Sequence, residues 1–228
     1  MSESREQVVV EFPLRGEWMA ANTPARRVPS HGTDRFGQRY AYDFVRVDSE
    51  GMPFHAGTTL HYLLSRVRLD DCYGWGQPIH SPVAGVVLQA EDGWPERQRL
   101  QPIKDLLRAL TNGLSLSSKR LGDFRRLGGN HIIIETSGGY TLLAHARTGS
   151  ITVSKGDAVE PGHHLADVGH SGNSTAPHLH FHMMDRPDLL AAQGVPCCFR
   201  EYEALRDGTW TRVENGIPKH TELIRSVV

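Results

Sequence analysis

The sequence lacks any long apolar run. No window approaches 18 consecutive apolar residues, which is about the length that indicates a transmembrane helix. Residues 1–11 mix charged side chains with only three consecutive valines, unlike the apolar core of a secretory signal peptide. We therefore expect no membrane span. We also expect a protein that is cytoplasmic as encoded and meets any extracellular substrate only after release or export by a non-classical route.

The sequence also has almost no net charge and few cysteines. Lys and Arg total 25 against 26 Asp and Glu, which gives a formal net charge of -1. This balance argues against nucleic acid or anionic lipid as a partner held by bulk charge. Three cysteines are an odd number in a chain of 228 residues, so a disulfide framework is not expected and the thiols should be reduced.

The length and uniform composition fit a single domain over residues 1–228. Alternating apolar and polar residues, bounded by Gly, Pro, Asn and Asp, predict short strands joined by tight turns. A mostly β, antiparallel fold is therefore expected. The predicted strands are Val8 to Phe12, Tyr40 to Val47, Val83 to Gln89, His131 to Glu135, Tyr140 to Ala146, Ile151 to Val153, His164 to Val168 and Leu179 to Met183.

One stretch interrupts this pattern, at about residues 91–127. Ile103, Leu106, Leu107 and Leu110 recur at helical spacing, which predicts a short helical insertion between two strands. From residue 111 to residue 126, a mobile polar loop is an equally good interpretation.

Histidine is abundant, with 13 residues, and three of them alternate in one short run: His178, His180 and His182. Side chains two residues apart in a strand share a face, with Cα atoms about 6.6 to 7 Å apart. That distance suits one imidazole bound to a metal and a second that acts on what the metal binds. A His-x-His pair alone is equally compatible with surface residues that are only hydrogen-bonded.

Other residues strengthen the metal-site interpretation. Residues 169–177 are small or turn-forming, so they keep bulky side chains away from His178. His145 stands at the exit of an apolar strand, and His31 lies in a polar loop. Asp43 is a carboxylate within a predicted apolar strand, where burial is costly unless the group is paired, hydrogen-bonded or bound to a metal.

These motifs resemble a known family, the lysostaphin-type zinc metallopeptidases, which include the peptidoglycan endopeptidases of the LytM kind. The most specific run is Gly-Asn-Ser-Thr-Ala-Pro-His-Leu-His-Phe at residues 172–181, and Leu143-Ala144-His145 also matches. Residues 81–87 and 31–44 extend the likeness to about two thirds of the chain. The resemblance implies an antiparallel β-sandwich or barrel-sandwich hybrid core, known as a duplicated hybrid motif.

Carried onto this sequence, the family pattern makes His31, Asp43 and His180 the ligands of a zinc ion. The family usually places its aspartate four residues after the first histidine, but that position here is Arg35. Asp43 is preferred because apolar strand residues follow it, and Asp34 is the alternative. The family also uses a tyrosine ahead of the first histidine, and that role is unassigned here.

The same resemblance makes His145 and His178 the catalytic pair and implies hydrolysis of peptide bonds in peptidoglycan cross-bridges or stem peptides. Three protein ligands leave a fourth zinc position open, as catalytic sites do. His178 is then the expected general base, and His145 would stabilise the oxyanion or protonate the leaving amine. His182 shares the face of His178 and His180 and would lie behind the ligands.

Two other functions fit parts of the sequence. A non-catalytic family member would bind or activate a partner, although such proteins generally lose ligands. A biotinyl or lipoyl carrier module is suggested by the succession of Val, Gly-Asp and Val over residues 153–165, but the turn at Gly172-Asn173 offers no lysine for attachment. The remaining histidines, including His131 and His170, are expected to be ordinary polar or half-buried residues.

Overall fold

The computed structural model describes residues 7–48, 67–101 and 124–227, together with residues 55, 62, 64 and 104. Within these ranges the fold is mostly β, as predicted. The helical elements described there are the 3-10 turns η1 (Arg35–Tyr40) and η2 (Leu69–Asp71) and the short helix α3 (Phe124–Gly128). The helix predicted around residues 103–110 falls outside the described residues except at position 104.

Fourteen strands are described. In chain order they are β1 (Val8–Val10), β2 (Glu17–Asn22), β3 (Tyr42–Arg46), β4 (Pro78–His80), β5 (Gly85–Glu91), β6 (Asn130–Thr136), β7 (Gly139–Ala146), β8 (Ala158–Val159), β9 (His164–Asp167), β10 (Leu179–Met184), β11 (Gly194–Val195), β12 (Cys197–Arg206), β13 (Thr209–Gly216) and β14 (Leu223–Arg225).

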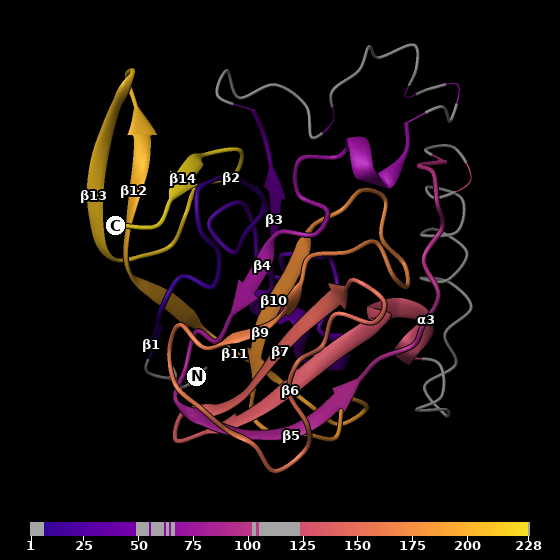
Figure 1. Cartoon of the computed structure of the whole chain (residues 1–228). Helices are drawn as coiled ribbons and strands as arrows, with labels where there is room; N and C mark the ends of the chain where they lie inside the picture. Colours follow the sequence, from indigo (N-terminus) through magenta and orange to yellow (C-terminus); the bar gives the residue numbers. More distant parts are fainter. Residues whose placement is uncertain are drawn as a thin grey trace.

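Twelve of these strands form one sheet, and β4 and β9 form a separate pair. The sheet runs β1-β12-β14-β2-β3-β10-β7-β6-β5-β8, with β11 added to β10 and β13 added to β12 (Figure 1). The pairings are antiparallel apart from β1 with β12, which is parallel. Neighbours such as β3 and β10 are far apart in sequence, so the sheet brings distant segments together.

Strand β10 occupies the middle of this sheet and is buried along its whole length. Leu179, Phe181 and Met183 point into the main core, as the alternation predicts. Phe181 packs there with Tyr42 and Phe199, with ring centroids 5.9 and 5.8 Å away. Burying an aromatic side chain of this size contributes about 1.5 to 3 kcal/mol, so the core fixes the position of β10 firmly.

Two strand expectations need correction. Ile151 to Val153 is not a strand, because its backbone hydrogen bond to β9 is the single one from Thr152 to Leu165, which does not make a ladder. The hairpin of β12 and β13 was not predicted. Its turn is Asp207-Gly208, with φ values of 49° and 75°, as a two-residue hairpin turn requires.

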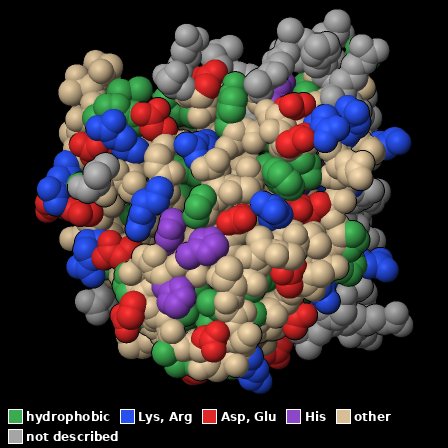
Figure 2. Space-filling view, in the orientation of Figure 1, with side chains coloured by type: hydrophobic (Ala, Val, Ile, Leu, Met, Phe, Trp, Pro, Cys, Tyr) green, Lys and Arg blue, Asp and Glu red, His purple; other side chains and the backbone are tan. Residues whose placement is uncertain are grey.

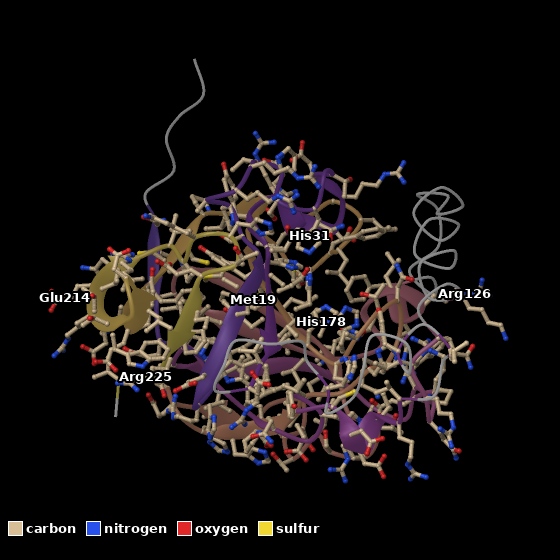
Figure 3. The ribbon with its side chains drawn as sticks, turned by 90° about the horizontal axis from the view of Figure 1, so that it is seen from above. Met19, His31, Arg126, His178, Glu214 and Arg225 are labelled. Carbon is tan, nitrogen blue, oxygen red and sulfur yellow. The ribbon has the colours of Figure 1, made fainter. Side chains whose placement is uncertain are left out.

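This hairpin and α3 lie at opposite sides of the molecule (Figure 1). His31 and His178 lie between them, as the labelled Glu214 on the hairpin and Arg126 on α3 show (Figure 3). On the face seen in Figure 2, cationic and anionic side chains are interspersed. The three cysteines are free and buried, as expected. No helix among the described residues is long and apolar enough to cross a membrane.

Candidate active site

The sheet register places two of the predicted ligands side by side. β10 pairs antiparallel with β3 so that His180 stands directly opposite Asp43. On the other side of β10, His180 is opposite Ala144 of β7, next to His145 in sequence. His31 comes from the polar loop between β2 and η1. Four of the predicted site residues are thus brought together by backbone pairing and one loop.

Asp43 is the centre of the first group. Its Oδ2 accepts a hydrogen bond from His31 Nε2 at 2.8 Å, and its Oδ1 accepts one from His180 Nδ1 at 2.9 Å. Asn22 Nδ2 donates to Oδ2 at 3.4 Å. The nitrogen and oxygen atoms that His31, Asp43 and His180 can offer to an ion all lie within 4.8 Å of one another.

The electrostatics of this group favour an ionised carboxylate. Burial by itself would raise the pKa of Asp43, but the charge of His31 and hydrogen bonds from His180 and His31 lower that pKa well below its ordinary value. Burial opposes the charge on His31, yet the Asp43 carboxylate raises the pKa of His31 overall. For His180, burial wins and the pKa is lowered.

The donor set fits zinc. Two imidazoles and one carboxylate are among the usual ligands of catalytic zinc, and here their donor atoms converge on one small volume. Among the described ranges, no other group of His, Cys, Asp and Glu converges in this way. Asp34, the alternative carboxylate, points elsewhere: its Oδ1 accepts a hydrogen bond from Arg39 at 2.6 Å, and its side chain is 62% exposed.

His145 and His178 form a second group beside the first. Their ring centroids lie 4.7 Å apart, and His145 is 5.9 Å from His180. Each ring donates its Nδ1–H to a main-chain carbonyl, His145 to Ser171 at 2.8 Å and His178 to Ala176 at 2.7 Å. This leaves Nε2 of both rings with a lone pair while the ring is neutral. Burial, followed by the charges of His178 and His180, lowers the pKa of His145 well below the usual value.

The backbone at His145 is unusual. Its φ is 65°, in the left-handed region that non-glycine residues rarely adopt. Such a conformation costs of the order of 1 to 3 kcal/mol and persists only where the surroundings hold it. Here the His145 carbonyl accepts a hydrogen bond from Gly169 at 2.9 Å, and the next carbonyl, of Ala146, accepts from Ser171 Oγ at 2.8 Å. The strain falls on a residue with candidate catalytic chemistry.

His182 lies behind the ligand pair. Its Nδ1 is 3.0 Å from His180 Nε2, so one of these nitrogens donates to the other. The ring is 1% exposed. Burial, and then the charges of His180 and His31, lower its pKa well below the ordinary value. His182 is therefore placed to orient the His180 ring.

All the predicted site residues line one cavity of about 710 Å³. His31 and His178, both labelled in Figure 3, belong to segments far apart in the sequence, one before η1 and the other before β10. The cavity walls also contain polar and apolar residues from η1 and the loop ahead of it, from α3, and from the loop before β10. These are Thr33, Arg35, Phe36, Gln38, Phe124, Leu127, Gly128, Asn173 and Thr175.

The expectation of ordinary polar or half-buried residues needs correction at three histidines, and the first of them, His55, is 4% exposed. His131 and His170 are the other two, and both are fully buried. His170 Nδ1 lies 2.9 Å from Ser174 Oγ, and its Nε2 lies 2.8 Å from Arg97 Nη2. Arg97 and His170 are 73 residues apart, and no sequence spacing predicts their contact.

The loop before β10 owes its shape to small residues. Gly172 has a φ of 69°, and a Cβ atom there would clash with the backbone of Gly129. The loop therefore packs backbone to backbone against residues 127–129. The sequence suggested that small residues here keep the approach to His178 open. The structure shows a different reason, which is close packing of two backbone segments.

The model of Peptidase family M23 matches residues 102–192. Among solved structures, the chain is similar to the catalytic domain of lysostaphin from Staphylococcus simulans, with 18% identity, a TM-score of 0.38, and coverage of 79% of this chain and 88% of that one. It is also similar to the catalytic domain of the prophage-encoded M23 protein EnpA from Enterococcus faecalis, with 16% identity, a TM-score of 0.38, and coverage of 68% and 73%.

A third similar structure is a zinc-containing peptidase from Vibrio cholerae, with 20% identity, a TM-score of 0.37, and coverage of 80% of this chain and 41% of that one. The family match includes His145, His178 and His180, whereas His31 and Asp43 lie before it. The resemblance drawn from the sequence is thus confirmed, because the segment that carries the three histidines matches Peptidase family M23.

Proposed function

We propose that this protein is a zinc metalloendopeptidase that hydrolyses peptide bonds in peptidoglycan cross-bridges or stem peptides. The observation that carries the proposal is the Asp43 carboxylate held between His31 and His180, with the His145–His178 pair in the same cavity. The family match supports a peptidase.

In this proposal, His31, Asp43 and His180 hold the metal. Zinc supplies a Lewis acid and lowers the pKa of water in its open position to about 7. The nitrogens involved are those that now donate to Asp43, namely Nε2 of His31 and Nδ1 of His180. To offer a lone pair there, each neutral ring would carry its proton on the other nitrogen, His31 on Nδ1 facing Ser30 Oγ and His180 on Nε2 facing His182 Nδ1. Asp43, which orders the two rings in the absence of metal, would complete the ligand set.

His178 accepts a proton from the attacking water. Its Nδ1–H is committed to the Ala176 carbonyl, so Nε2 is the nitrogen available as a base. That atom lies 3.6 Å from Asp43 Oδ1, beside the proposed ligands. A base next to the site where water is bound meets the geometric requirement for general base catalysis.

His145 faces the same substrate from β7. Because burial lowers its pKa, the ring is neutral at rest, and an imidazolium formed there during turnover is a strong acid. Its Nε2 would first accept the proton that His178 takes from the water, since the two ring centroids are 4.7 Å apart, and would then donate it to the leaving amine or to the developing oxyanion. The two histidines thus divide proton removal and proton delivery.

The substrate class rests on the family resemblance and on the shape of the site. A cavity of about 710 Å³ that opens between loops accepts an extended peptide segment. Polar Thr33, Gln38 and Asn173 offer hydrogen-bonding groups to a peptide backbone. Open glycine-rich cross-bridges and stem peptides satisfy these conditions.

Metal analysis joined to a digestion assay tests the proposal. Zinc content is measured by atomic emission, and muropeptides and glycine-rich cross-bridge peptides are incubated with the wild type and with His178→Ala. We expect about one zinc per chain in both proteins and hydrolysis by the wild type only, with a fall of at least about a hundredfold in the variant. Zinc binding without hydrolysis by the wild type would instead favour a non-catalytic family member.

A further inference from the structure

A buried hydrogen-bond chain leads from His178 away from the cavity. It passes from His178 Nδ1 to Ser174 Oγ at 3.2 Å and from Ser174 Oγ to His170 Nδ1 at 2.9 Å. It ends at Arg97, whose Nη2 lies 2.8 Å from His170 Nε2. Ser174 and His170 are 2% and 0% exposed, so these bonds form away from water.

The charge of Arg97 sets the direction of the two hydrogen bonds of His170. A guanidinium only donates, so His170 Nε2 accepts and carries no proton. His170 therefore bears its proton on Nδ1 and donates it to Ser174 Oγ. The Ser174 hydroxyl proton goes to the Ala176 carbonyl at 2.6 Å, which leaves Oγ as an acceptor toward His178.

The consequence at His178 is a fixed ring. Its Nδ1–H points at two acceptors, Ala176 O at 2.7 Å and Ser174 Oγ at 3.2 Å. The carbonyl alone defines which nitrogen carries the proton. His170 holds the Ser174 oxygen in place by donating a hydrogen bond to it. This second acceptor limits the rotation of the His178 ring and keeps Nε2 directed toward the cavity.

Arg97 also ties down the backbone that carries His178. Its Nη2 donates to the Ser174 carbonyl at 2.9 Å. The preceding residue, Glu96, accepts through its carboxylate from the main-chain N–H of His170 and of Thr148. Trp94 is joined to Asn130 of β6 by a reciprocal pair of hydrogen bonds. Residues 94–97 therefore form a rigid support for the loop before β10.

We propose that Arg97 is a positioning residue for the general base: through His170 and Ser174 it holds the His178 imidazole with Nδ1–H turned inward and Nε2 turned toward the substrate. This inference rests on the proposed function, because it assigns His178 the role of base. Arg97 itself is not among the residues that line the cavity.

The main test compares Arg97→Met with Arg126→Met, which removes the same charge from an exposed position on α3 outside the cavity lining. Zinc-loaded proteins are assayed on the peptide that the wild type cleaves. We expect Arg97→Met to lower kcat roughly tenfold, the lower end of losses seen for residues that orient a reacting group, with KM and zinc content nearly unchanged. Arg126→Met should match the wild type, and Arg97→Lys, which keeps one donor, should recover part of kcat.

A spectroscopic readout separates this role from simple support of the loop. In protein labelled with 15N-histidine, the wild type should show His170 and His178 each as a single tautomer, protonated on Nδ1. In Arg97→Met, His170 should gain the Nε2–H tautomer, because no donor then faces that nitrogen. Ser174→Ala, which leaves the backbone bonds of Arg97 in place, should lower kcat in the same direction while His170 keeps its tautomer.

The outcomes also separate this inference from the proposed function. Equal kcat values for Arg97→Met and Arg126→Met would overturn it even if the wild type is an active zinc peptidase. A wild type that cleaves nothing would end the enzymatic proposal, yet the His178 signals of Ser174→Ala would still show whether the chain from Arg97 orders that ring. If Arg97→Met does not fold, Ser174→Ala decides: unchanged kcat and unchanged His178 signals contradict the inference.

Discussion

The two groups of histidines in the cavity are held in different ways. On one side, His31 and His180 bond to the side chain of Asp43. On the other side, His145 and His178 bond to main-chain carbonyls of the loop that precedes β10. The first group depends on one carboxylate, whereas the second depends on the fold of the loop. We call His31, Asp43 and His180 the proposed ligand side, and His145 and His178 the proposed catalytic side. The ligand side should lose its order as a unit when Asp43 is lost, and the catalytic side should keep its order.

Removing Asp43 gives the largest expected effect. Asp43→Ala deletes the acceptor shared by His31 and His180 and leaves their nitrogens without that partner. We expect zinc affinity, measured by competition with a chelator, to fall by more than about a hundredfold, and hydrolysis to fall with it. The 15N signals of His145 and His178 should stay in place. A change in the tautomer of either ring would show that the two sides are not independent.

Replacing His145 should break only the catalytic side. His145→Asn keeps a residue type that tolerates positive φ and can still donate to Ser171 O, but it removes Nε2. We expect normal zinc content and a fall in kcat of about a hundredfold. His145→Ala, which lacks both properties, should in addition lower the melting temperature. Zinc loss in His145→Asn would instead make this residue part of the ligand side.

A buried histidine outside both groups provides a reference for acid sensitivity. Burial lowers the pKa of His131 below 6.5, so the unfolded chain binds its proton more readily than the folded one. The contribution of neutral, buried His131 to the free energy of unfolding is therefore fully present above pH 6.5. It is lost as the pH falls from 6.5 through the lower pKa of the folded state. In urea unfolding, His131→Leu should lose less stability than the wild type between pH 7 and 5.5, by about 1 kcal/mol. Parallel pH curves for the two proteins would contradict this assignment.

Asp34 should give the smallest effect. Its bond to Arg39 is exposed on both partners, and such pairs contribute at most about 1 kcal/mol. Asp34→Ala should therefore keep zinc affinity and kcat within about twofold of the wild type, in contrast to Asp43→Ala. Loss of zinc in Asp34→Ala would instead show that Asp34, the alternative carboxylate, binds the metal.

The sequence predicts the site where chemistry and local pattern coincide. Alternation around Leu179 and Phe181 identifies a strand and places His178 and His180 on the same strand face, and an isolated acid among apolar residues marks Asp43. Residues 197–216 alternate around Asp207-Gly208, a pattern that is typical of a hairpin and equally local. That hairpin is not among the predicted strands.

Arg97 and His170 are different, because their contact depends on how residues 94–97 fold back over the loop before β10. Neither residue type nor spacing indicates that contact, so it can be recognised only in the folded structure. The same holds for His131, whose burial follows from its place in β6 beneath Phe124 rather than from its neighbours in sequence.

The left-handed backbone of His145 has a consequence for directed evolution. A glycine there would relieve about 1 kcal/mol of backbone strain, so selection for heat resistance alone would favour replacing a side chain to which the proposed mechanism assigns proton transfer. A library sorted for turnover is drawn the opposite way. The residue recovered at position 145 would thus record which of the two pressures a population had experienced.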